Sequence, residues 1–163
     1  MTENIVLVAQ DESKNPPSTK TVGTGGMMSA RVGANLARYD LFFTNTRIIA
    51  AVVFSQSDMS RWGPAAQFQT IGASMKWKKI KEEMRSKFAG KTPDEILQLH
   101  PESLQFPYTY IQSAEVEKKM IGGKLVLHMN TTAGVQKFEI PAPKSRLNEI
   151  ENTLKMYLPG RVR

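Results

Sequence analysis

The chain has 163 residues, a hydrophobic fraction of 40%, two histidines and no cysteine. This length suits a single domain with a substantial core, and the lack of cysteine excludes disulfides, thiolate zinc sites and cysteine nucleophiles. The formal net charge of +7 favours anionic partners such as phospholipid head groups, nucleic acid or an acidic protein surface.

The first third of the chain combines a short strand with irregular sequence. Ile5–Ala9 is an apolar run that predicts a strand, and polar residues with two prolines predict a loop over 10–20. We interpret 22–36 as extended or irregular. Within it, Gly23–Gly26 lacks the Gly-Lys-Ser/Thr ending of a phosphate-binding loop, so a turn or a close backbone approach is the better interpretation.

Residues 39–54 predict a β-hairpin. Two apolar segments flank the polar tip Thr44–Thr46, whose asparagine suits a tight turn. The second arm, 47–54, is apolar on both faces, so both faces must be covered. The first arm places alternate apolar residues on one face: Tyr39, Leu41 and Phe43.

Residues 55–104 interrupt the strand pattern with two predicted helices. An apolar stripe recurs at helical spacing and is followed by Gly90 as a C-cap. A second, short helix begins with Thr92 as N-cap, Pro93 at the first position and Glu95 closing a capping box. The stripe consists of Ala73, Trp77, Ile80, Met84 and Phe88.

Alternation returns after this region and predicts further strands up to residue 140. The alternation slips near Ile111, as a β-bulge would cause, and Gly122-Gly123 marks a turn. A last apolar stripe over 145–158 predicts a helix with Ser145 as N-cap and a stop at Pro159-Gly160.

Two segments resemble a known family. Residues 39–49 are similar to the "Y-x-L-T-N-x-R-L-I" hairpin of bacterial and archaeal pleckstrin-homology-like (GRAM-like) domains. Residues 106–116 are similar to their "I-P-Y-x-x-I-x-S-V" strand. With the terminal helix, the resemblance covers 39–54 and 106–158.

The resemblance implies an α+β fold over 1–163. It consists of a pleckstrin-homology-like antiparallel β-barrel or sandwich with a helical insertion at about 55–104 and a C-terminal capping helix. Phosphoinositide specificity is not expected, because the loop 10–20 has only Lys14 and Lys20 where eukaryotic phosphoinositide binders carry a basic cluster.

The sequence does not indicate an enzyme. His128 fits a half-exposed strand position, and His100 lies before a proline at a helix end, where capping of carbonyls is the usual role. No metal-ligand or catalytic-triad spacing occurs, so we predict no catalytic residue, no metal site and no cofactor.

The basic helix is the candidate site. On a helical wheel its lysines border the apolar stripe, which is the arrangement of a helix lying at a membrane interface. Burial of the stripe is worth about 1.5–3 kcal/mol per side chain, which exceeds the attraction of about 1 kcal/mol per lysine to an anionic surface. The role of the helix therefore depends on which surface buries the stripe. We favour packing on the sheet over membrane insertion. The basic ridge comprises Lys76, Lys78, Lys79, Lys81, Arg85 and Lys87, and the interfacial or core stripe comprises Trp77, Ile80, Met84 and Phe88.

We therefore predict a non-catalytic binding or adaptor module whose basic ridge contacts an acidic protein or anionic phospholipid head groups. A nucleic-acid-binding protein is the alternative, and homo-oligomers are left open. Residues 1–10 lack the basic start of a signal peptide, and no stretch approaches the length of a membrane span. We expect a cytoplasmic protein, with peripheral attachment at the inner face of the membrane as a further option.

Overall fold

The fold consists of two antiparallel sheets and three helices within the described residues. The computed structural model of the chain describes residues 2–13, 37–55 and 71–163, with the backbone alone for 71–76. The expectations for 14–20 and 22–36, including Gly23–Gly26, lie outside these residues. The coarse prediction of an α+β fold with antiparallel strands is confirmed.

The first sheet contains the predicted hairpin. Its strand order is β1-β2-β3-β4, all antiparallel, and the hairpin β2–β3 turns at Asn45-Thr46. The buried Thr44 hydroxyl fixes this turn, because it accepts from the backbone N–H groups of Thr46 and Arg47 at 3.1 and 3.0 Å. The strands are β1 (Ile5–Ala9), β2 (Ala37–Thr44), β3 (Arg47–Ser55) and β4 (Leu104–Pro107).

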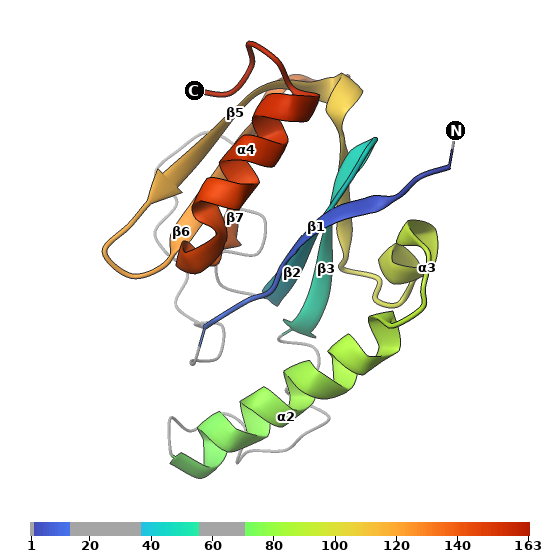
Figure 1. The fold of residues 1–163 in the computed structure, drawn as a ribbon, viewed down its shortest axis with the longest axis vertical. Helices are drawn as coiled ribbons and strands as arrows, with labels where there is room; N and C mark the ends of the chain where they lie inside the picture. The colour runs from blue at the N-terminus through green and yellow to red at the C-terminus, as the bar shows by residue number, and fades with distance from the viewer. Residues whose placement is uncertain (1, 14–36, 56–70) are drawn as a thin grey trace.

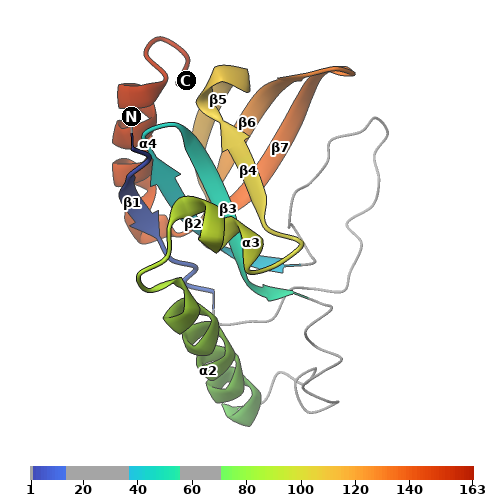
Figure 2. The same cartoon turned by 90° about the vertical axis from the view of Figure 1, so that its right-hand side faces the viewer.

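The second sheet is a three-stranded meander. The chain passes from β4 through the 3-10 turn Tyr108–Tyr110 into β5 (Ile111–Lys118), then β6 (Gly123–Thr131) and β7 (Gly134–Ala142). The predicted irregularity near Ile111 is present, since the register with β6 shifts between Ile111 and Ser113. The two sheets meet at this corner, which Figure 2 shows as β4 running into β5.

The main core lies between the two sheets and the last helix, α4 (Leu147–Tyr157). The buried face of α4 contributes Leu147, Ile150 and Leu154, and Figure 1 shows α4 lying across the second sheet. The prediction that Ser145 caps α4 is wrong. Arg146 occupies the N-cap without a side-chain bond, and the Ser145 hydroxyl lies in the preceding 3-10 turn and donates to Glu12.

The outer face of the first sheet is covered, as a strand that is apolar on both faces requires. The cover comes from α2 (Ile71–Phe88) and α3 (Pro93–Gln98), which lie between β3 and β4 in the chain. They pack on Ile49, Ala51 and Val53 of β3. Figure 1 shows both helices on the side of the strands away from α4.

The geometry tests one local prediction in this region, the capping box, and shows one irregularity, at Phe54. The capping box of α3 is confirmed, because the Thr92 side chain accepts from the N–H of Glu95 and the Glu95 carboxylate accepts from the N–H of Thr92 at 2.7 Å. Phe54 departs from simple alternation along β3. The β2–β3 register shifts at Val53, and Phe54 packs against Trp77 of α2 instead of joining the main core.

Candidate functional site

The apolar stripe of α2 is buried against the sheet. Trp77 and Phe88 are 5% and 8% exposed, and Ile80 is buried beside them. The ring of Phe88 meets Phe42 edge to face at 5.3 Å between centroids, and Trp77 meets Phe54 in the same way at 4.1 Å. Met84 is half-buried at the margin. The stripe therefore acts as a cover for β3, which is the interpretation that the sequence favoured.

Two residues of the expected ridge, Lys81 and Arg85, are engaged inside the protein. The Lys81 ammonium lies 2.9 Å from the Asp11 carboxylate and also donates to the carbonyl of Ser13. The Arg85 guanidinium donates from Nε and Nη2 to the buried Asp40 carboxylate at 2.7 and 2.8 Å. This differs from the expectation that both would remain on a positive surface. They lie beside the stripe, opposite Asp40 on the inner strand β2 and Asp11 just after the edge strand β1.

The geometry explains the electrostatics of this junction. The hydrogen bond from Arg85 to Asp40 raises the pKa of the guanidinium and outweighs the effect of burial. A charged group at this depth is tolerated only when its partner is present and the remaining donors are satisfied. The Arg85 Nη2 also donates to the backbone carbonyl of Asp11 at 2.9 Å, which completes the arrangement.

Only part of the ridge remains available to a partner. Lys78, Lys79 and Lys87 are exposed on the outer face of α2, but Glu82 and Glu83 are exposed on the same face. The side chain of Lys76 lies outside the described residues. Alternating charges of both signs make this face a weaker attractor for anions than the sequence suggested.

The turn between β5 and β6 carries a second basic surface. The sequence pattern indicated only the turn. Lys118 and Lys119 are exposed, and the next two residues, Met120 and Ile121, are 95% and 93% exposed. The ammonium of the exposed Lys144 donates to the backbone carbonyl of Met120 at 3.3 Å. These five residues are called the hairpin tip below. In the sequence, this surface was indicated only by the adjacent residues Lys-Lys-Met-Ile before a pair of glycines.

The base of the hairpin tip is locked by ion pairs. Lys124 lies 2.9 Å from Glu117 and 3.0 Å from Glu139, and Lys137 lies 2.9 Å from Glu139. Hydrogen bonds from Lys137 and Lys124 lower the pKa of Glu139 to about 2. Glu117 and Glu139 are therefore neutralised by neighbours and do not oppose the charge of Lys118 and Lys119.

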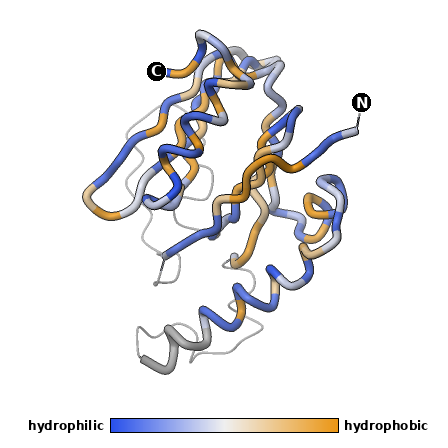
Figure 3. The backbone as a smooth tube through the Cα atoms, in the orientation of Figure 1, coloured by the Kyte–Doolittle hydropathy of each residue, from blue (hydrophilic) through white to orange (hydrophobic). Residues whose placement is uncertain are grey.

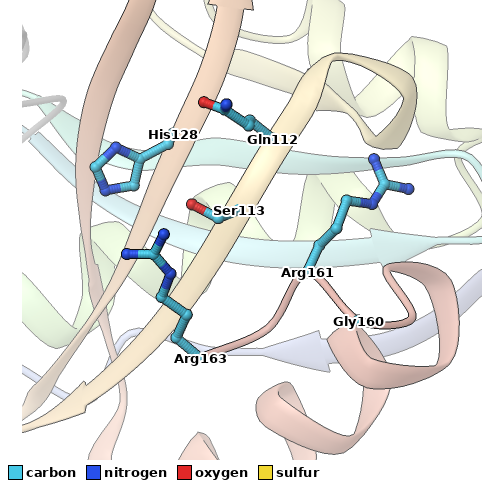
Figure 4. A pocket seen from close by; sticks show the side chains of 6 residues that line it. All are labelled: Gln112, Ser113, His128, Gly160, Arg161 and Arg163. Carbon is cyan, nitrogen blue, oxygen red and sulfur yellow. The ribbon is translucent and has the colours of Figure 1, made fainter.

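A shallow polar cavity of about 270 Å³ lies on the second sheet. Figure 4 shows Ser113, His128 and Arg163 on one side of β5, with Arg161 pointing the other way. Arg161 is committed to backbone carbonyls, including that of Ile111 at 2.8 Å. The cavity combines a hydroxyl, an imidazole and a guanidinium and contains no carboxylate, so its chemistry suits a small anion.

The other histidine, which the sequence predicts to cap a carbonyl, contacts the backbone two residues further along the chain. The Nδ1 atom of His100 accepts from the backbone N–H of Glu102 at 3.1 Å. Within residues 2–13, 37–55 and 71–163, no three His, Asp or Glu side chains are grouped closely enough to hold a metal ion. No helix in these same ranges is long and apolar enough to cross a membrane.

Comparison of the chain with family models, with curated proteins and with solved structures found no match.

Proposed function

We propose that the chain is a non-catalytic binding module that attaches to an anionic phospholipid surface through exposed lysines. Its architecture is proposed to be of the pleckstrin-homology-like kind. The order of short antiparallel strands followed by one helix that closes the core supports this assignment. The motifs at 39–49 and 106–116 lie on the hairpin β2–β3 and on the corner from β4 to β5.

The distribution of charge carries the proposal. Eight of the described acidic residues form ion pairs with lysine or arginine, and most of these pairs join elements of the fold or brace α4: Glu3, Asp11, Asp40, Asp94, Glu117, Glu139, Glu149 and Glu151. Seven exposed lysines form no ion pair within the described ranges, against five exposed acids there: Lys78, Lys79, Lys87, Lys91, Lys118, Lys119 and Lys144, and Glu12, Glu82, Glu83, Glu95 and Glu115. A surface of this kind attracts an extended array of negative charge.

A lipid surface is favoured over the two other anionic partners. Single-stranded nucleic acid is bound by basic grooves with exposed aromatic rings, but Trp77 and Phe88 of the basic helix are buried against β3. Binding to an acidic protein would require a single defined patch of basic residues. The exposed lysines instead lie on α2, on the turn after it and on or beside the β5–β6 hairpin.

Vesicle flotation tests the proposal. The protein should float with phosphatidylcholine vesicles that contain phosphatidylserine, should stay behind with pure phosphatidylcholine, and should be released by salt because exposed charges are screened. Fluorescence anisotropy with short DNA and RNA, and with polyglutamate as an acidic polypeptide, runs beside it. Tighter binding to either probe than to the vesicles would overturn the choice of partner, and substrate turnover abolished by a point change would overturn the class.

Lys118→Gln with Lys119→Gln should weaken flotation, because the acid next to them, Glu117, is already paired with Lys124 and does not offset their charge. Lys155→Gln is the matched control. It removes one exposed positive charge that already lies beside Glu151 on α4. The tip variant removes two charges and the control removes one. If the loss of flotation per charge removed is the same in both, net charge alone determines binding, and the assignment to the free lysines is wrong.

A further inference from the structure

We propose that the hairpin tip inserts Met120 and Ile121 into the boundary between head groups and acyl chains of an anionic bilayer. The inference rests on the proposed function and adds a second, apolar part to the attachment. The exposed lysines supply attraction to the surface, and the two apolar side chains supply penetration below it.

The exposure of these two neighbours is the first observation. Met120 and Ile121 are 95% and 93% exposed, whereas the other large exposed apolar side chains are isolated or less exposed, such as Met156 at 72% and Val135 at 54%. Figure 3 shows the hydrophobic colour at the turn between β5 and β6, directly after a hydrophilic stretch. Two adjacent apolar side chains at the end of a hairpin can enter a bilayer together without unfolding the sheet.

The side chains of Met120 and Ile121 project from a turn whose backbone is fixed at its base. The N–H of Lys119 donates to the carbonyl of Gly122 at 3.2 Å, and Gly122 has a φ of 76°, which closes the turn in a conformation that favours glycine. The next residue, Gly123, lies close against α4, because a Cβ there would be 2.7 Å from the Leu147 side chain, which would have to shift. The turn therefore packs closely on α4 at its base and presents Met120 and Ile121 outward.

Charge complementarity identifies the occupant as an anionic lipid surface. Lys118, Lys119 and Lys144 surround the two apolar residues, and lysines at this position reach phosphate and carboxylate head groups while the apolar side chains go deeper. The nearest acid along β5 is Glu117, three residues before Met120 in the chain. Glu117 is also paired with Lys124. On the other side of the tip, the exposed Glu12 and the Lys81-paired Asp11 line the same pocket as Ile121 and Lys144, so the free positive charge of the tip is carried mainly by Lys118 and Lys119.

A single-cysteine label tests insertion directly, because the chain has no cysteine of its own. An environment-sensitive nitrobenzoxadiazole dye is attached to Met120→Cys and, as the matched control, to the exposed Met156→Cys on α4. On vesicles that contain phosphatidylserine, the dye at 120 should shift to the blue and should be quenched by a lipid-borne quencher. The dye at 156 should show neither effect.

Substitution supplies the second measurement. Met120→Ser with Ile121→Ser should lower the vesicle partition coefficient by about tenfold or more, since both side chains lose their apolar burial, and Met156→Ser should leave it unchanged. Circular dichroism should show no change in any variant, because these side chains make no buried contacts.

The two proposals fail in different ways. If the unlabelled protein does not float with anionic vesicles, the proposed function is wrong and the insertion falls with it. If the protein floats but the dye at 120 stays unshifted and the Ser variants bind normally, attachment is electrostatic and the insertion is overturned. The dye at 120 could instead shift to the blue with polyglutamate or DNA but not with vesicles. This result would place the tip against an acidic protein or nucleic acid and would also overturn the insertion.

Discussion

Helix α2 and the β5–β6 hairpin tip both combine lysines with apolar side chains, but the fold places them in opposite environments. Trp77 on α2 is 5% exposed and Ile121 at the tip is 93% exposed. On α2 even a lysine is buried, since Lys81 is 8% exposed and bound to Asp11. Similar composition therefore does not indicate a similar role.

The difference follows from what each segment finds nearby. The stripe of α2 lies beside β3, whose outer face is apolar and needs a cover, and Asp11 and Asp40 lie where the flanking cations arrive. Met120 and Ile121 lie on a turn beyond the ends of the strands. An apolar segment with an apolar surface in reach becomes core, and one without such a surface remains available to a partner.

The largest effect is expected from removing the anchor of α2. Trp77→Ala should lower the free energy of unfolding by about 3–5 kcal/mol, because it leaves a cavity against Phe54. In a Trp62→Phe background, the emission of Trp77 should be blue-shifted in the free protein and unchanged by vesicles. Met156→Ala is the control and should change stability by less than about 0.5 kcal/mol. A Trp77 emission that responds to vesicles would contradict the statement that α2 is buried against the sheet while the hairpin tip is free to bind.

The next effect concerns the ion pair beneath α2. Asp40→Ala should cost about 3 kcal/mol of unfolding free energy, because it leaves the Arg85 guanidinium partly buried without its carboxylate. Replacing both residues, Asp40→Leu with Arg85→Met, should recover much of this loss. Urea denaturation measures both. If Asp40→Ala is as stable as the wild type, the pair does not hold α2 to the sheet.

A smaller effect separates the lysines of the two regions. Lys118→Gln with Lys119→Gln should weaken binding to anionic vesicles by about 1 kcal/mol per lysine. Lys78→Gln with Lys79→Gln should weaken it less, because Glu82 and Glu83 lie on the same face of α2. Vesicle partition coefficients of the two double variants, measured at one salt concentration, compare the two losses. An equal or larger loss from the α2 pair would place the main contact on the helix.

The smallest effect concerns the acids behind the tip. The folded pKa of Glu139, about 2, lies below the ordinary value of 4.5, so its contribution to stability is present above pH 4.5 and is lost as the pH falls toward 2. Glu139→Gln should flatten this part of the stability profile by less than about 1 kcal/mol, because the ion pairs are partly exposed. Lys124→Met with Lys137→Met should flatten it in the same way. An unchanged slope in both variants would contradict the assignment.

Much of the fold was predictable because its signals are local. The β2–β3 turn at 44–46, the capping box at Thr92 and the irregularity near Ile111 each depend on a few adjacent residues. The need for a cover over β3 was also predictable, since a strand that is apolar on both faces cannot face water. The bulge at Val53 was not, because it depends on the pairing of β3 with β2 and so on residues distant in the sequence.

The candidate site was less predictable for the same reason. A helical wheel places Lys81 and Arg85 beside the stripe, but it does not show that Asp11 and Asp40 lie opposite them, 70 and 45 residues away in the chain. The hairpin tip has the converse problem. Two apolar residues next to a glycine turn are unremarkable in a sequence, and they gain meaning only from an exposed fraction above 90%.

The segment after α4 also protects the second sheet from association. The outer edge of β5 would otherwise present unpaired backbone groups, which recruit strands from other molecules and begin aggregation. Ala114 on this edge donates to the carbonyl of Arg161 and accepts from the N–H of Arg163, both at 2.9 Å. A few residues laid parallel to β5 thus block the centre of that edge, which allows β5 to carry an exposed apolar tip without making the whole hairpin prone to form fibrils.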